Sequence, residues 1–185
     1  FEAQLDDLSL LRDSMVAIAE LIDETELLIR RDGIKMVAAD RAVVAVVDFF
    51  LSKNAFSKYN YERDLRVGIN LINFLRILRR AGPTDIMKIW VSENKFSIKL
   101  VGDSTRSFVL PIIDVSKEEI PPIDKLEFQT QFEINNEILS AGIDDADLIT
   151  DSVVFNVSKD IFLLKADSDS SSTELELNPG NGLKN

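Results

Sequence analysis

Two stretches of this chain, far apart in the sequence, repeat one pattern at a constant offset. Residues 21–40 read LIDETELLIRRDGIKMVAAD, and residues 148–167 read LITDSVVFNVSKDIFLLKAD. Phe1 and Phe128 hold matching places upstream, and no gap is needed along either stretch. The chain is therefore predicted to contain two copies of one fold, with a period far longer than that of a solenoid repeat.

Composition limits the chemistry that this chain can perform. Of its 185 residues 45% are hydrophobic, and neither cysteine nor histidine occurs. Those two side chains serve most often as general bases near neutral pH and as transition-metal ligands. We therefore predict no catalytic residue, no metal site and no cofactor, and an enzyme is the least favoured interpretation. No run of about eighteen apolar residues and no leader is visible, so an intracellular protein without a membrane partner is expected.

The formal net charge of −11 would repel a polyanion over most of the surface, with one local exception. Residues 67–84 contain no acidic side chain, and Arg76, Arg79 and Arg80 recur there at helical spacing. The apolar residues of the same segment follow a helical repeat on another side. The three arginines are candidate phosphate ligands, and the alternative is a solvated helix face whose cations offset the helix dipole.

The hydrophobic pattern predicts an α+β fold, with helices gathered on one face of antiparallel sheet. Ser9 is expected to cap the first helix, Asn70 the second, and Gly82-Pro83 to end it. Asp32-Gly33 is expected to close a hairpin, and residues 52–62 to form a connection. Strands are expected at residues 1–5, 25–30, 34–39, 42–50, 65–68, 86–91, 96–101, 107–113, 153–157, 161–166 and 173–177, with a third helix at 137–147.

The segment DVSKEEIPPIDKLE, residues 114–127, interrupts this pattern with acidic residues and paired prolines. Paired prolines favour an extended backbone, so we expect a strap that crosses the surface. This divides the chain into a first domain at 1–114, a connector at 115–127 and a second domain at 128–185. The second copy stops after the strand at 173–177, so the complete protein is expected to be longer.

Several segments resemble, in order, the proliferating cell nuclear antigen family of DNA sliding clamps. They are FEAQL, LIDETELLIRRDGIKMVAAD, VGINLINFLRILRRAG, GDSTRSFVLPIIDVS and LITDSVVF. The GDSTRSFVLPIIDVS segment is closer to archaeal members. The resemblance implies two similar domains per subunit, a three-subunit ring around double-stranded DNA with helices lining the hole, and no catalysis. A cytoplasmic, nucleoid-associated location is the corresponding expectation.

The resemblance also implies roles for particular residues. Arg76, Arg79 and Arg80, joined by Arg12, would face DNA phosphates, whereas residues 136–147 of the second domain contain no lysine or arginine. DNA polymerase, flap endonuclease, ligase and the clamp loader would insert short peptide motifs into an apolar pocket. On pattern alone its valines are more typical of strand core. The pocket residues would be Ala39, Val43, Val44, Val46, Ile120, Pro121, Pro122, Ile123 and Leu126.

Two segments resemble the edge strands that join neighbouring clamp subunits, although either fits an internal strand as well. One contains Ser107, Phe108, Val109 and Leu110, and the other contains Thr173, Glu174, Leu175, Glu176 and Leu177. Unpaired edges invite such pairing, and a head-to-tail contact can close a ring. The remaining alternatives are a paralogous subunit of a heterotrimeric clamp and an interaction scaffold that never encircles DNA.

Overall fold

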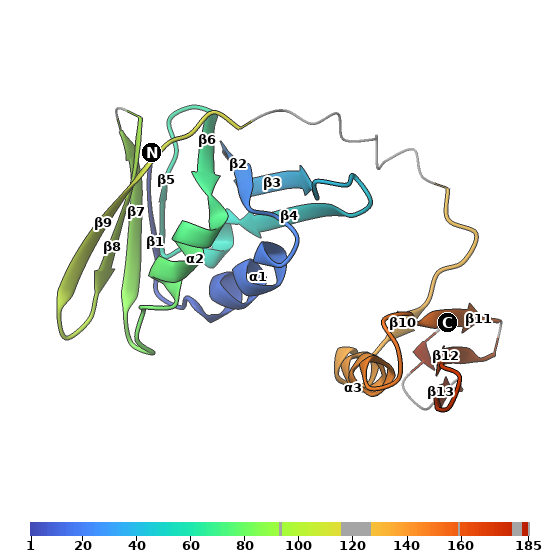
Figure 1. The fold of residues 1–185 in the computed structure, drawn as a ribbon. Coiled ribbons are helices and arrows are strands. Elements are labelled where there is room, and N and C mark those ends of the chain that lie inside the picture. The colour runs from blue at the N-terminus through green and yellow to red at the C-terminus, as the bar shows by residue number, and fades with distance from the viewer. Residues whose placement is uncertain (93, 116–126, 159, 179–182, 185) are drawn as a thin grey trace. The chain divides into compact units, whose positions relative to one another are not determined.

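The computed structural model describes residues 1–92, 94–115, 127–158, 160–178 and 183–184 (Figure 1). The chain divides into two compact units, Phe1–Ile123 and Asp124–Asn185, and each is described by itself. The connector predicted at 115–127 lies outside the described residues except at its two ends. No helix among the described residues is long and apolar enough to cross a membrane.

The first unit contains two antiparallel sheets and two helices. One sheet has five strands in the order β5-β1-β7-β8-β9, and the other has four in the order β4-β3-β2-β6. Helices α1 and α2 lie side by side, on one side of the five-stranded sheet (Figure 1). The elements are β1 (Glu2–Leu5), α1 (Ser9–Ala19), β2 (Glu24–Arg30), β3 (Gly33–Ala39), β4 (Val46–Ser52), β5 (Lys58–Asn60), β6 (Leu65–Asn70), α2 (Leu71–Leu78), β7 (Ile86–Ser92), β8 (Lys95–Val101) and β9 (Thr105–Pro111).

Both helices bury the apolar stripe that their sequences predict. Leu11, Met15 and Ile18 of α1 join a core to which α2 adds its own apolar side chains. Those of α2 are Leu71, Phe74, Leu75, Ile77 and Leu78.

The two helices begin differently. The Asn70 carboxamide oxygen accepts a hydrogen bond from the Asn73 amide at 2.9 Å, so the predicted cap of α2 is confirmed. The predicted cap of α1 is wrong, because Ser9 is already helical. Its amide donates instead to the Asp7 carboxylate at 2.8 Å.

The largest differences from the predicted strands lie at two places. The strand expected at 42–50 begins only at Val46, because the residues before it form a loop around Asp40. Residues 58–60, expected in a connection, form β5 and pair with β1. The hairpin between β2 and β3 is present, with Arg31 and Asp32 in the turn and Gly33 starting β3. A Cβ atom at Gly33 would collide with the Leu51 carbonyl oxygen, so this position requires glycine.

The second unit repeats part of this plan. Helix α3 (Asn136–Asp147) precedes a three-stranded sheet in the order β11-β12-β13. Its core is small, with Phe162 and Leu164 completely buried. The strands are β10 (Glu133–Ile134), β11 (Val154–Val157), β12 (Phe162–Asp167), β13 (Ser172–Leu177) and β14 (Leu183–Lys184). The predicted α+β fold with antiparallel sheets is therefore confirmed.

Candidate nucleic-acid interface

The three predicted arginines lie on the solvent side of α2 and of the turn that follows it. Arg76, Arg79 and Arg80 are all exposed, while the opposite side of the helix is buried in the core. None of them forms an ion pair with another described residue, and Arg76 makes one long hydrogen bond of 3.4 Å, to Asn73. Their guanidinium groups therefore remain available to an anionic ligand.

Helix α2 is shorter than its sequence predicts. It ends at Leu78 rather than at residue 82, and Arg79 is its C-terminal cap. The Arg80 amide donates to the Ile77 carbonyl at 2.9 Å and the Ala81 amide to the Leu78 carbonyl at 3.1 Å, which tightens the last turn. Arg80 thus lies in a turn, whereas Arg76 belongs to the helix proper.

A partly buried ion pair that the sequence did not reveal supports this turn. Arg106 on β9 pairs with Asp85, which is 6% exposed, and also donates to the Arg80 carbonyl oxygen at 2.7 Å. The Gly82 amide donates to the same Asp85 carboxylate at 2.7 Å. The pair holds the main chain between Arg80 and Gly82, and therefore the positions from which Arg79 and Arg80 extend.

The other two helices contribute less positive charge. Arg12 on α1 is half-buried and lies 3.7 Å from its neighbour Asp13, so part of its charge is already compensated. Helix α3 of the second unit contains no basic residue and exposes Asp144, Asp145 and Asp147. Among the described helices, the exposed positive charge is therefore concentrated on α2 and its C-terminal turn.

The described residues of the predicted peptide pocket lie in an exposed loop and at the adjoining ends of β3 and β4. Val43 is 45% exposed and Val44 is 86% exposed, Val46 starts the edge strand β4, and Ala39 ends β3 half-buried. The strap residues of this prediction lie outside the described part of the chain, namely Ile120, Pro121, Pro122, Ile123 and Leu126.

Asp40 organises the loop that carries the two valines. Its carboxylate accepts hydrogen bonds from the amides of Val44 and Ala45 at 2.8 Å each, and of Ala42 at 3.3 Å. These hydrogen bonds, led by that from Ala45, lower the pKa of Asp40 below its ordinary value. Val43 is held with φ of 54°, a left-handed conformation that β-branched residues rarely adopt. Such strain is typical of functional loops.

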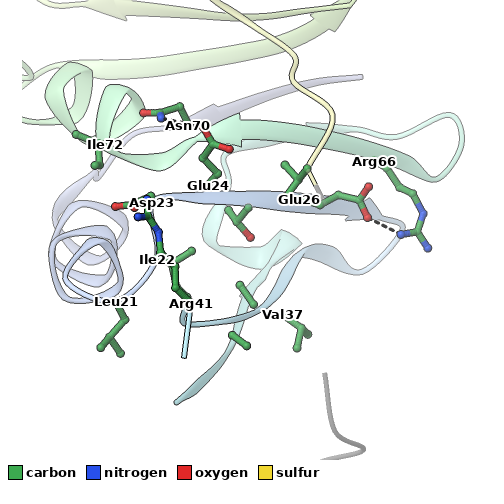
Figure 2. Close-up of a pocket in the computed structure, with 14 residues that line it drawn as sticks. Leu21, Ile22, Asp23, Glu24, Glu26, Val37, Arg41, Arg66, Asn70 and Ile72 are labelled. Carbon is green, nitrogen blue, oxygen red and sulfur yellow. Dashed lines mark hydrogen bonds and ion pairs between the residues drawn. The ribbon is translucent and has the colours of Figure 1, made fainter. Parts of the chain in front are cut away.

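A separate cavity of about 620 Å³ opens beside this loop, among β2, β3 and β6 (Figure 2). Its rim carries two exposed ion pairs, Arg66 with Glu26 and Arg41 with Asp23. Thr25 in its wall is 1% exposed, and its hydroxyl has no hydrogen-bond partner among the described residues. Of the predicted pocket residues, Ala39 lines this cavity, whereas Val43, Val44 and Val46 do not.

Both predicted interface segments are edge strands of their own sheets. Within the described part of the chain, β9 pairs only with β8 and β13 only with β12, so each has one edge without a partner there. Ser107 and Val109 of β9 are exposed, while Phe108 and Leu110 pack on the core. In β13, Glu174 and Glu176 are exposed, Thr173 and Leu175 are half-buried and Leu177 is buried.

Comparison with known proteins relates this arrangement to a family. The model of the proliferating cell nuclear antigen N-terminal domain matches residues 1–117. "DNA polymerase sliding clamp 1" of Pyrobaculum aerophilum is 32% identical over 167 residues, which are 90% of this chain and 67% of that protein. "DNA polymerase sliding clamp" of Thermococcus gammatolerans is 32% identical over 178 residues, which are 96% of this chain and 71% of that protein.

Solved structures agree with the sequence relatives. The crystal structure of PCNA from Thermococcus kodakaraensis has a TM-score of 0.89 and 26% identity, covering 100% of this chain and 75% of that one. The PCNA2-PCNA3 complex from Sulfolobus tokodaii has a TM-score of 0.88 and 28% identity, covering 98% of this chain and 74% of that one. The chain therefore belongs to the proliferating cell nuclear antigen family and is similar to its archaeal members.

Proposed function

We propose that this chain is a subunit of a DNA sliding clamp, a non-catalytic ring that encircles duplex DNA and retains replication and repair proteins on it. The observation that carries the proposal is the arginine row, Arg76, Arg79 and Arg80, on α2 and the turn that follows it in a protein of net charge −11. All three are exposed, and none forms an ion pair with another described residue. The relatives named as DNA polymerase sliding clamps support it.

The arginine row suits a ring that must move along DNA. Arg76 and Arg79, with Arg80 and Arg12 beside them, would neutralise a few phosphates without reading any base. Such binding is independent of sequence, and its strength falls steeply with salt. Because the affinity of a few exposed contacts is low, retention on DNA comes from ring closure, while the arginines centre the duplex.

Ring closure is assigned to the two free edge strands. β9 of one subunit would pair with β13 of the next, a head-to-tail contact that generates a closed ring when the rotation fits. Similarity to a PCNA2-PCNA3 complex favours, as second candidate, a chain that closes a mixed ring with paralogous subunits.

Partner proteins are assigned to the Asp40 loop. Val43, Val44 and Val46 present exposed apolar side chains on this loop and at the start of β4. Burying one such side chain against a partner contributes about 1.5–3 kcal/mol, enough for a short motif with two or three apolar anchors to bind reversibly. DNA polymerase, flap endonuclease, ligase and the clamp loader are the partners expected there.

Topology separates a clamp from a scaffold. The protein is bound to closed circular DNA, the circle is cut with a restriction enzyme, and the protein that stays with DNA during gel filtration is measured. A clamp is retained on the circle and released after cutting. Equal retention on both forms would support the non-encircling scaffold. Light scattering of the same sample distinguishes a self-made trimer from a monomer that requires paralogous partners.

A further inference from the structure

The five-stranded sheet has a second face, opposite to the two helices (Figure 1), on which lysines gather around the only tryptophan of the chain. Strand register places these side chains together, because Lys88 pairs with Lys99 and Trp90 with Ser97 across β7 and β8. Glu2 is the one acidic residue that these five strands, all fully described, direct to this face. The four lysines are Lys58, Lys88, Lys95 and Lys99.

Among the described residues, most of this positive charge has no ion-pair partner. Lys58 pairs with Glu2 at 2.9 Å, and this hydrogen bond is the main cause that lowers the pKa of Glu2, with a smaller attraction from Lys88. Lys88, Lys95 and Lys99 form no ion pair with another described residue. Like charges placed directly opposite each other on neighbouring strands destabilise a sheet. An anionic ligand would remove that repulsion.

The tryptophan adds a specific binding surface to this charge. The Nζ atom of Lys99 lies 5.7 Å from the centre of the Trp90 ring, a cation–π contact. An exposed cation–π contact is weaker than the stacking of a nucleic-acid base on an aromatic ring. A base can therefore displace the Lys99 ammonium group from the ring, and the freed lysine can then bind the adjacent phosphate.

We infer that the face centred on Lys88, Trp90 and Lys99 binds single-stranded nucleic acid without sequence preference. β7 and β8 are internal strands whose main-chain groups are paired on both sides, so a peptide cannot bind there by adding a strand. An acidic peptide would pair with the lysines but has no base to replace Lys99 on the Trp90 ring. In a duplex the bases are already stacked, so none is free to stack on Trp90. This site is distinct from the arginine row of α2, which lies on the other side of the sheet, and does not depend on ring formation.

Trp90 is the only tryptophan of the chain, so its fluorescence reports binding at this site directly. Titration of the intact protein with an oligothymidylate of roughly ten nucleotides at low salt is expected to quench this fluorescence. Because three lysines would contact phosphates, the logarithm of the binding constant should fall with the logarithm of salt at a slope of about −2. Absence of quenching at low salt would overturn the inference.

Variants locate the binding site. K88Q/K99Q is expected to weaken binding at least about tenfold, since two of the three lysines that would contact phosphates are lost. K35Q is the matched control, because Lys35 pairs with Asp48 on the other sheet, and it should bind as the unchanged protein does. Quenching should persist in R76Q/R79Q, which separates this site from the proposed clamp function. Quenching that survives in K88Q/K99Q would contradict the assignment.

Two further measurements identify the ligand class. Trp90→Phe, followed by the anisotropy of a labelled oligonucleotide, should weaken binding roughly threefold to tenfold through poorer stacking. Polyglutamate and a duplex of the same length should quench little in the unchanged protein. Equal quenching by polyglutamate would make this an acidic-peptide site, and equal quenching by the duplex would exclude base stacking. Either result would overturn the inference.

Discussion

The hydroxyl group of Tyr59 lies 2.6 Å from the main-chain carbonyl oxygen of Arg30 and so connects the two sheets of the first unit. Tyr59 belongs to β5 of the five-stranded sheet, and Arg30 ends β2 of the other sheet. The Gly33 carbonyl oxygen is a second acceptor at 2.8 Å, and the Tyr59 ring packs against Phe1 and Phe56. In addition to its pairing with β1, this strand of three residues is thus held by one hydroxyl group and two aromatic contacts.

This contact predicts a loss of stability in alkali. Burial raises the pKa of Tyr59 to about 12, above its ordinary value of 10. A raised pKa means that the fold favours the protonated hydroxyl, so its contribution is complete below pH 10 and is lost as the pH rises from 10 to 12. Tyr59→Phe should cost about 1 kcal/mol at pH 8 and should reduce the further loss above pH 10.

Urea unfolding at pH 8 and at pH 11 tests this prediction. The matched control is Tyr61→Phe, because Tyr61 donates only to Asp64, a neighbour on the same loop. Its replacement should leave most of the alkaline loss in place. An unchanged alkaline loss in Tyr59→Phe would show that other groups cause it.

The ion pair under the α2 turn predicts an asymmetric response to mutation. Arg106→Leu would leave the buried Asp85 carboxylate without its cation, at a cost of about 2 kcal/mol, reduced because a third of the Arg106 side chain is exposed. Arg66→Leu, which breaks the exposed pair with Glu26, should cost less than about 1 kcal/mol. Urea unfolding measures both changes, and equal costs would mean that burial of Asp85 is unimportant.

The sequence predicted those elements that depend on residues close together in the chain, such as helix caps, turn residues and the apolar repeat of a helix. Helix α2 follows from an apolar repeat that begins after an asparagine cap and ends before Gly82-Pro83. The hairpin between β2 and β3 follows from the Asp32-Gly33 dipeptide, which is typical of tight turns. The internal repeat predicted the partial copy in the second unit, where α3 again precedes a sheet of short strands.

Long-range and side-chain effects determine what the sequence did not predict. β5 is too short to produce a pattern and exists because it pairs with β1, more than fifty residues earlier. Asp85 and Arg106 look like ordinary surface charges until the fold brings them together. The valines after Asp40 alternate as in a strand. The Asp40 carboxylate accepts hydrogen bonds from the amides of Ala42, Val44 and Ala45, and the chain therefore forms a loop there. The arginine row was predictable because helix spacing alone separates it from the core.

We expect that relieving the backbone strain at Val43 in the Asp40 loop makes the protein more stable but weakens its binding of partner peptides. Val43 has a left-handed φ of 54°, which costs free energy for a β-branched residue, whereas glycine adopts this conformation freely. Val43→Gly should therefore raise the free energy of unfolding by up to about 1 kcal/mol. It should also weaken binding of partner peptides, because an exposed apolar side chain is lost and the loop is less ordered.

Ala42→Gly is the control, because it adds flexibility without relieving strain and should lower stability by roughly 0.5 kcal/mol. Thermal or urea unfolding measures stability, and peptide titration measures binding. Lower stability in Val43→Gly than in the unchanged protein would show that the loop carries no strain.

The arginine row predicts how duplex binding depends on salt. If Arg76 and Arg79 each neutralise one phosphate, the slope of the logarithm of the binding constant against the logarithm of salt should become less steep by about 0.9 for each arginine replaced. R76Q, R79Q and the double variant are titrated with a labelled duplex by anisotropy over a range of salt concentrations.

R30Q is the matched control, since Arg30 is exposed at the end of β2 and its loss changes the net charge equally. Because only charges that contact phosphates release counterions, R30Q should shift affinity slightly and leave the slope unchanged. A slope altered as much by R30Q as by R79Q would mean that overall charge, rather than this helix, attracts the DNA.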